Sequence, residues 1–283
     1  MPSRSNPTAR QQRLGVELKK MREAAGLSTE QAAALLETNR TVITNTEAGR
    51  HGVSAERVRR MACNYECPDA DLIEALARMA GDRSKGWWEE YRGVLPPTFL
   101  DIAELEWFAN SLRMSTMMHI PGPFQTEAYA RALFAAAIPA LPGEEFERRV
   151  AHRIRRCRIL ERAEPVPYTA VIHEAALRIE VGGRKVLREQ LESVLELSER
   201  DGITVQALPF AAGAFPGSGQ TILYAVGDVP SLDVVQLDRT MVAEFLHVEA
   251  QLKKFSLQLD QMQRDALSPD DTRSLIHTIA RQL

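Results

Sequence analysis

Four polar residues that lie close together in the sequence have the chemistry needed to read the edges of DNA bases: Arg40, Thr41, Thr44 and Asn45. An asparagine forms two hydrogen bonds with adenine, a threonine offers a hydroxyl and a methyl group, and an arginine forks onto guanine or a phosphate. In a helix, residues 41, 44 and 45 share one face, because positions three and four apart are neighbours. The spacing therefore predicts a compact polar surface on one side of a short helix.

That helix is predicted over residues 40–48. Asn39 is its natural N-cap, and Gly49 follows its last turn, where glycine commonly ends a helix. A shorter helix precedes it, capped by Ser28, and Gln31 stands three positions later, where a capping box requires it. Two helices joined by a short turn thus lead up to the polar surface.

Apolar residues at helical spacing indicate three further helices, one ending at Gly26, one after Ser54 and one after Pro68. We therefore expect a mainly α protein whose N-terminal domain, residues 1–80, is a five-helix bundle. A linker is predicted over 81–100 and an α+β regulatory domain over 101–283.

The runs Gly26-Leu27-Ser28-Thr29-Glu30-Gln31 and Ile43-Thr44-Asn45-Thr46-Glu47-Ala48-Gly49 resemble the helix-turn-helix domains of Xre-family repressors. The resemblance implies that the third helix enters the major groove of double-stranded DNA, and that Glu47 is a scaffold residue. The DNA-binding residues expected on this basis are Thr29, Asn39, Arg40, Thr41, Thr44, Asn45 and Arg50.

Two departures from the family bear on these expectations. Thr29 replaces a glutamine that is frequent there, which changes one DNA contact. Thr46 stands where a large apolar residue usually packs, which predicts a less tightly packed bundle. Phosphate contacts are expected from Arg50 and His51, with Arg10, Arg13 and the arginines of the fourth helix as further candidates.

The distribution of charge agrees with binding at one end. Residues 1–65 hold 11 lysines and arginines against 6 glutamates, whereas residues 66–283 hold 24 against 32 acidic residues. A basic N-terminal segment on an acidic body suits a protein that touches nucleic acid with one end. Because one bundle contacts few base pairs, we expect a homodimer that binds half-sites about one helical turn apart.

The C-terminal domain is predicted to contain a modest sheet with packed helices. Helices are expected over 101–115, 125–137, 143–162, 184–200 and two more after residue 250, and strands over 168–173, 204–208, 221–226 and 234–237. In the helix over 143–162, arginines surround an apolar stripe. Most of them are expected on a solvated face, although that face is also a candidate for binding a ligand, a partner or DNA.

Several motifs of this domain resemble the domain that follows Xre-type heads in WhiJ-like regulators of actinobacterial development and antibiotic production. They are Trp87-Trp88, Ile120-Pro121-Gly122, Gln125-Thr126-Glu127-Ala128-Tyr129-Ala130-Arg131, His173-Glu174-Ala175-Ala176-Leu177-Arg178 and Leu208-Pro209-Phe210-Ala211-Ala212-Gly213. The resemblance implies a repressor-like regulator, without catalytic activity, that works with a small acidic partner protein encoded nearby, an antitoxin-like pair.

Two interpretations of the C-terminal domain therefore stand side by side. It binds a small partner protein, or it senses a small molecule that shifts DNA affinity. An apolar pocket with polar groups favours the sensor, and an exposed apolar patch favours the partner. The candidate binding residues for either are Pro121, Gly122, Gln125, Glu174, Arg178 and Phe215.

Enzymatic chemistry finds little support. Residues 217–219 lack the spacing of a nucleophile elbow, and no glycine-rich phosphate loop follows a strand. Cys63 and Cys67 have no second ligand pair, so we expect buried thiols and no metal or other cofactor. No apolar run is long enough for a membrane span or a signal peptide, which predicts a cytoplasmic protein.

Overall fold

The computed structural model describes residues 7–82, 84, 86–238 and 243–283. These form two compact units, one of Met1–Glu89 with Asp228–Leu232 and one of Glu90–Gly227 with Asp233–Leu283. Arg83 and Lys85, which belong to the predicted linker, lie outside the described residues.

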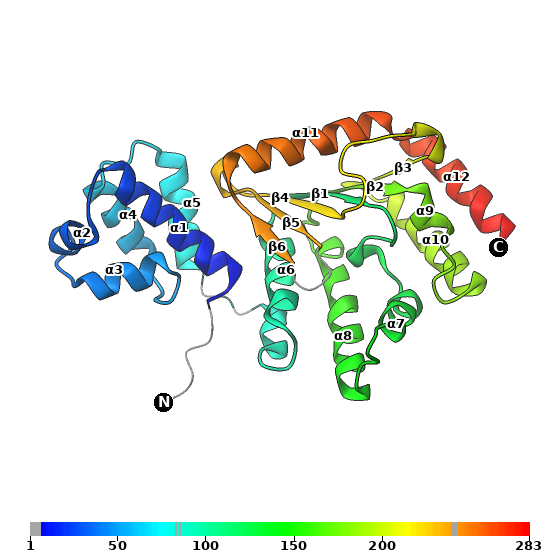
Figure 1. Cartoon of the computed structure of the whole chain (residues 1–283), viewed down its shortest axis with the longest axis horizontal. Coiled ribbons are helices and arrows are strands. Elements are labelled where there is room, and N and C mark those ends of the chain that lie inside the picture. Colours follow the sequence, from blue (N-terminus) through cyan, green and yellow to red (C-terminus); the bar gives the residue numbers. More distant parts are fainter. Residues whose placement is uncertain (1–6, 83, 85, 239–242) are drawn as a thin grey trace. The chain divides into compact units, whose positions relative to one another are not determined.

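The first unit contains the predicted bundle of five helices (Figure 1). They are α1 (Ala9–Ala24), α2 (Thr29–Leu35), α3 (Arg40–Glu47), α4 (Ala55–Asn64) and α5 (Ala70–Gly81). Their core is continuous, and Leu18, Ile43, Met61 and Leu76 in it come from four different helices and are fully buried. Packing of these apolar faces stabilises helices that are too short to persist alone in water.

Side-chain caps begin all five helices of the bundle. Ser28 and Gln31 form the predicted capping box at α2, and the Asn39 Oδ1 atom accepts a hydrogen bond of 2.9 Å from the Val42 amide at α3. Thr8, Ser54 and Asp69 cap α1, α4 and α5. These caps satisfy backbone donors that a helix leaves unpaired at its N-terminus.

The second unit contains one six-stranded sheet in the order β3-β2-β1-β4-β5-β6. Its strands are β1 (Ser111–Thr116), β2 (Tyr168–His173), β3 (Ile203–Leu208), β4 (Ile222–Val226), β5 (Val234–Leu237) and β6 (Glu244–Leu246). The first three run parallel, whereas β4 is antiparallel to both β1 and β5, and β6 is antiparallel to β5. The carboxyl ends of β1, β2, β3 and β5 therefore lie at one edge of the sheet, the carboxyl edge.

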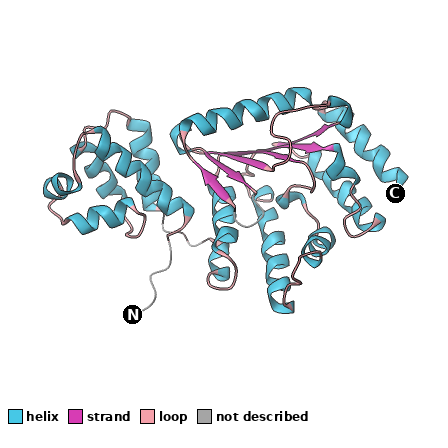
Figure 2. Cartoon of the chain, viewed as in Figure 1, coloured by secondary structure: helices cyan, strands magenta, loops and turns pink. Residues whose placement is uncertain are grey.

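Helices cover both faces of this sheet (Figure 2). They are α6 (Pro97–Phe108), α7 (Glu127–Ala135), α8 (Gly143–Arg156), α9 (Glu174–Arg178), α10 (Arg184–Ser198), α11 (Glu249–Asp265) and α12 (Pro269–Gln282). Leu252, Phe255 and Leu259 of α11 pack on one face against β4 and β5. On the other face, the largest core includes side chains of α7, α9, α10 and α12. The expected α+β domain, a small sheet with packed helices, is confirmed.

One predicted element is wrong. The helix expected over 101–115 ends at Phe108, and residues 111–116 form β1 at the centre of the sheet. Leu112 is buried in the main core, and β2 and β4 supply hydrogen-bonding partners on both sides of the strand. Tertiary pairing thus overrides the weak local preference of a strand that contains a single β-branched residue. The helix expected over 143–162 likewise gives way after Arg156 to a 3₁₀ turn, Cys157–Leu160.

Among the described residues, every helix is too short or too polar to cross a membrane.

Candidate nucleic-acid interface

A buried ion pair fixes the end of α3 against α1. The Arg22 Nε atom lies 2.6 Å from Glu47 Oε1, and Arg22 Nη2 lies 2.9 Å from Glu47 Oε2. Both side chains are nearly inaccessible, and Arg22 Nη1 also donates to the Leu27 carbonyl in the turn before α2. The hydrogen bonds to Glu47 raise the pKa of the Arg22 guanidinium. One arginine therefore joins α1, the turn and α3, and Glu47 has the scaffold position that the resemblance implied.

Arg22 was not predicted from the sequence as the partner of Glu47, although its position in α1 gives a signal. Arg22 lies four residues after Leu18, so it shares the apolar face of α1. An arginine on a buried face needs an acidic partner, because an unpaired buried charge is costly.

The predicted polar surface of α3 is present on the bundle. Thr41 and Thr44 are exposed and Asn45 is partly exposed, whereas Ile43 and Thr46 are buried. The Thr44 hydroxyl donates to the Arg40 carbonyl one turn earlier, at 3.0 Å. The helix thus separates a core face from a polar face, as the spacing predicted.

The remaining predicted residues surround this surface. Arg40 is exposed and lies 3.0 Å from Glu30 of α2 in an exposed ion pair. Thr29 begins α2, and its hydroxyl donates to the Glu30 carboxylate. Arg50 is exposed directly after Gly49 and has no ion-pair partner among the residues that the structure describes. Asn39 differs from these, because its side-chain oxygen is occupied in capping α3.

The less tightly packed bundle expected from Thr46 is not observed. Thr46 is 5% exposed, and α1 approaches α3 closely at Gly15. A Cβ atom at Gly15 would lie 2.4 Å from the Glu47 carbonyl oxygen and 2.8 Å from that of Thr46. The absent side chain of Gly15 allows the backbones to meet, so a small residue at position 46 accompanies close packing.

Several candidates for phosphate contacts are already committed to protein contacts. Arg13 is buried and bonded to Glu17 and to the Ser231 carbonyl, so its assignment as a phosphate ligand is wrong. Arg59 of α4 forms two hydrogen bonds with Glu74. Arg50 retains an unpaired guanidinium within the described part of the chain.

The six candidate binding residues of the second unit follow the parallel strands and lie toward the carboxyl edge. They divide into two groups that no hydrogen bond links within the described chain. Pro121, Gly122 and Gln125 follow β1 and are buried. Glu174 and Arg178 form an ion pair in α9, after β2, and Glu174 also accepts a hydrogen bond from the Phe210 amide. Phe215, after β3, contacts the His173 ring at 5.4 Å between centroids. The binding role of all six stays a prediction.

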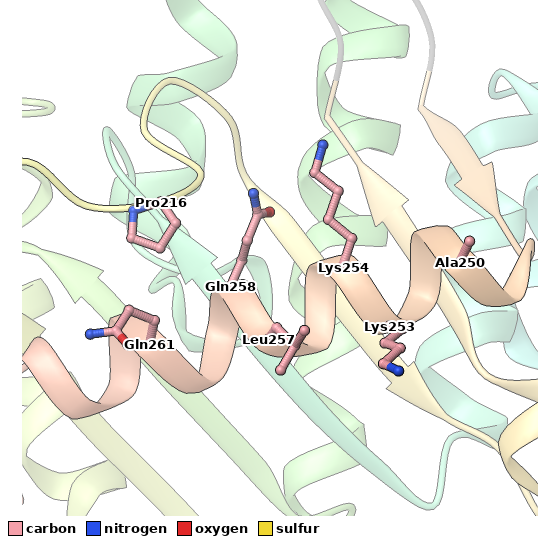
Figure 3. A pocket seen from close by; sticks show the side chains of 7 residues that line it. All are labelled: Pro216, Ala250, Lys253, Lys254, Leu257, Gln258 and Gln261. Carbon is pink, nitrogen blue, oxygen red and sulfur yellow. The ribbon is translucent and has the colours of Figure 1, made fainter.

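A shallow open groove along α11 was not anticipated. It is lined by Pro216, Ala250, Lys253, Lys254, Leu257, Gln258 and Gln261 (Figure 3). Leu257 is 57% exposed, and the two lysines form no ion pair among the described residues. The buried residues of α11 recur at helical spacing, whereas a single exposed leucine outside that stripe gives no periodic signal.

The cysteines are free, but Cys63 is exposed, contrary to the expectation of buried thiols. Within the described residues, no histidine, cysteine, aspartate and glutamate side chains gather in a group that could hold a metal ion.

Two family models match the chain. Residues 13–76 match a helix-turn-helix domain, and residues 99–278 match a family described as "Domain of unknown function (DUF5753)". No curated protein and no solved structure matches the chain.

Proposed function

The chain belongs to the DUF5753 family and carries a helix-turn-helix domain of DNA-binding regulators, and from this premise we propose that it is a homodimeric, repressor-like transcription regulator that reads double-stranded DNA with α3. The observation that carries the proposal is the polar face of α3, with Thr41, Thr44 and Asn45, opposite a side anchored by the Arg22–Glu47 pair. A rigidly held recognition helix loses little conformational freedom on binding. This is the arrangement expected of an Xre-type head.

The roles of the side chains differ in kind. Asn45 and the two threonines contact base edges, and Arg50 contacts a phosphate. Arg40 leaves Glu30 at little cost to contact guanine or a phosphate, because water screens an ion pair between two exposed side chains.

Selection of random duplex DNA by the full chain at physiological salt tests this proposal. We expect enrichment of a two-fold symmetric motif with half-sites about one helical turn apart. On that motif, Asn45→Ala should reduce discrimination by about 1–3 kcal/mol at one position. Arg50→Ala should weaken binding to all sequences and lower the slope of log affinity against log salt by about one.

Lys185→Ala is the matched control for Arg50→Ala, because Lys185 is an exposed cation in α10 of the other unit. Wild-type affinity and selectivity in both head variants would show that α3 is not the recognition helix.

The groove along α11 supports a second proposal, that the WhiJ-like C-terminal domain binds a small acidic partner protein. Leu257 offers an apolar contact, and Lys253 and Lys254 beside it form no ion pair with any residue that the structure describes, on a domain with net negative charge. A partner with carboxylates around an apolar side chain complements this surface.

The product of the neighbouring gene provides the test. Lys253→Glu with Lys254→Glu should abolish its binding to the full chain, whereas Lys185→Glu should not. Equal binding by both variants would reject the groove as the docking site.

A further inference from the structure

Arg153 differs from the other arginines of α8. Arg148 and Arg149 pair with glutamates one turn earlier, Arg155 pairs with Glu90, and Arg156 forms two hydrogen bonds with Glu106. No carboxylate lies within ion-pair distance of Arg153 in the described part of the chain. Helix α8 therefore contains, at Arg153, a half-buried guanidinium without a counter-ion in the described part of the chain.

The surroundings of Arg153 hold it in one orientation and leave part of it open. Its Nη1 atom donates to Gln125 Oε1, and Gln125 Nε2 donates in turn to the Ile120 carbonyl at 2.7 Å. The guanidinium carbon lies 5.1 Å from the centroid of the Phe134 ring. The Nε and Nη2 atoms donate no hydrogen bond to any described residue, and Arg153 is partly exposed to solvent. These two atoms form the side of a guanidinium that fits a carboxylate bidentately.

The electrostatics agree with an unsatisfied cation. Loss of hydration and, to a smaller extent, the charge of Arg156 lower the pKa of Arg153 to about 10, although Glu106 and Asp238 act to raise it. Glu106 is already paired with Arg156. Asp238 acts from beyond ion-pair distance and accepts a hydrogen bond from Gln236. The protein therefore compensates the charge of Arg153 incompletely.

Arg153 is also placed where α/β proteins bind ligands. Gln125 and His119 follow β1 and Asp238 follows β5, and both strands end at the carboxyl edge. Ligands of open α/β sheets commonly bind outside the carboxyl ends of the strands. Arg153 reaches this edge through its hydrogen bond to Gln125, and burial together with the charge of Arg153 lowers the pKa of His119.

We propose that Arg153 binds the carboxylate of a small organic acid through Nε and Nη2, with Gln125 as the residue that positions the guanidinium. One uncompensated cation matches a single negative charge. A phosphate dianion is disfavoured, because Asp238 is close and the charge of Arg156 is already neutralised by Glu106. The Phe134 ring provides apolar surface for the body of the acid. The proposal does not depend on DNA binding, since all of these residues belong to the second unit.

Calorimetric titration of the full chain with acetate, hexanoate and benzoate tests the proposal, with sodium phosphate at matched ionic strength for comparison. We expect saturable binding of at least one of the three acids, and a tenfold to hundredfold loss of affinity in Arg153→Met, the range for a charged hydrogen-bonding group. Arg149→Met is the matched control, because Arg149 lies on the same helix, also over an aromatic ring, and is paired with Glu145.

If Arg153→Met does not fold, Arg153→Lys serves instead, because lysine keeps the charge and lacks the fork; it should also bind at least tenfold more weakly. No saturable binding of any acid, equal binding by the Arg153 variant, or tighter binding of phosphate would each overturn the proposal. DNA affinity of the same variants, measured without acid, should equal that of the wild type, so failure here is separable from failure of the head.

Discussion

Glu47→Gln is expected to lower the free energy of unfolding of the N-terminal bundle by about 3–5 kcal/mol. The magnitude follows from burial. Arg22 and Glu47 are 7% and 6% exposed in their side chains, so removing the carboxylate charge leaves the buried Arg22 guanidinium with only the exposed carboxylate of Glu23, 3.7 Å away, as a counter-ion. Small domains have total stabilities of about 5–15 kcal/mol, so this single change removes much of the margin.

The pair of Arg59 with Glu74 provides a control with the same geometry and different burial. Its two hydrogen bonds are 2.8 and 2.7 Å long, but both side chains are 50% exposed. Solvent screening leaves such an exposed pair with little net effect, so Glu74→Gln should change the free energy of unfolding far less than Glu47→Gln does.

Hydrogen exchange of the full chain measures the difference locally. Amides of α1 and α3 that exchange through opening of the bundle should lose protection by about a hundredfold to a few thousandfold in Glu47→Gln, and less than tenfold in Glu74→Gln. If the two variants lose protection equally, burial does not decide the strength of the Arg22–Glu47 pair, and the argument for its scaffold role fails.

Two further predictions concern the same bundle. Tyr65→Phe should raise the free energy of unfolding by up to about 1 kcal/mol in a denaturant titration, because the Tyr65 hydroxyl is buried without a hydrogen-bond partner in the described structure. Burial raises the pKa of Tyr65 to about 12, whereas the unfolded tyrosine ionises near 10; the wild type should therefore lose stability relative to Tyr65→Phe as pH rises from about 10 to 12, and equal slopes would contradict this. Gly15→Ala should destabilise the bundle by about 1–3 kcal/mol despite the higher helix propensity of alanine, because its Cβ meets the Glu47 carbonyl. Gly81→Ala should instead be neutral or stabilising in the same denaturant titration, since its Cβ would lie 3.5 Å from that of Ala55.

The bundle is predictable from the sequence because its signals are local. Ser28 with Gln31, Asn39 and Gly49 each mark a helix end, and each mark depends only on backbone groups within a few residues of it. Arg22 and Glu47 lie 25 residues apart, so no local spacing connects them. The resemblance to the repressor family indicated Glu47 alone, without its partner.

The centre of the sheet is harder to predict for the same reason. β1 is a strand because β2 and β4 flank it, and the partners of Leu112 in those strands, Tyr168 and Ala225, lie 56 and 113 residues further along the chain. The ion pairs of α8 also differ in how far they can be predicted from the sequence. Those of Arg148 and Arg149 with glutamates four residues earlier follow from spacing, whereas the pairing of Arg156 with Glu106, and hence the isolation of Arg153, depends on the fold.

Among the residues predicted to bind DNA, Asn39 already uses its side-chain oxygen to cap a helix. Its Oδ1 atom accepts the Val42 amide, and a cap of this kind contributes about 1 kcal/mol to helix stability. Asn39→Ser separates capping from DNA contact, because serine is also a good N-cap but has no amide group. If Asn39 acts as a cap, Asn39→Ser should keep both the unfolding free energy and the DNA affinity, whereas Asn39→Ala should lose stability by about 1 kcal/mol.

Loss of DNA affinity in Asn39→Ser at unchanged stability would instead assign the Asn39 amide to the interface. The comparison applies to the whole recognition surface. Arg40 is held by an exposed pair that costs little to break, and Arg50 has no described ion-pair partner, so both are available to DNA at once. A residue held by a buried or capping bond must first give up that bond. The predicted DNA contacts therefore differ in the intramolecular bond that each side chain must break before it can bind DNA.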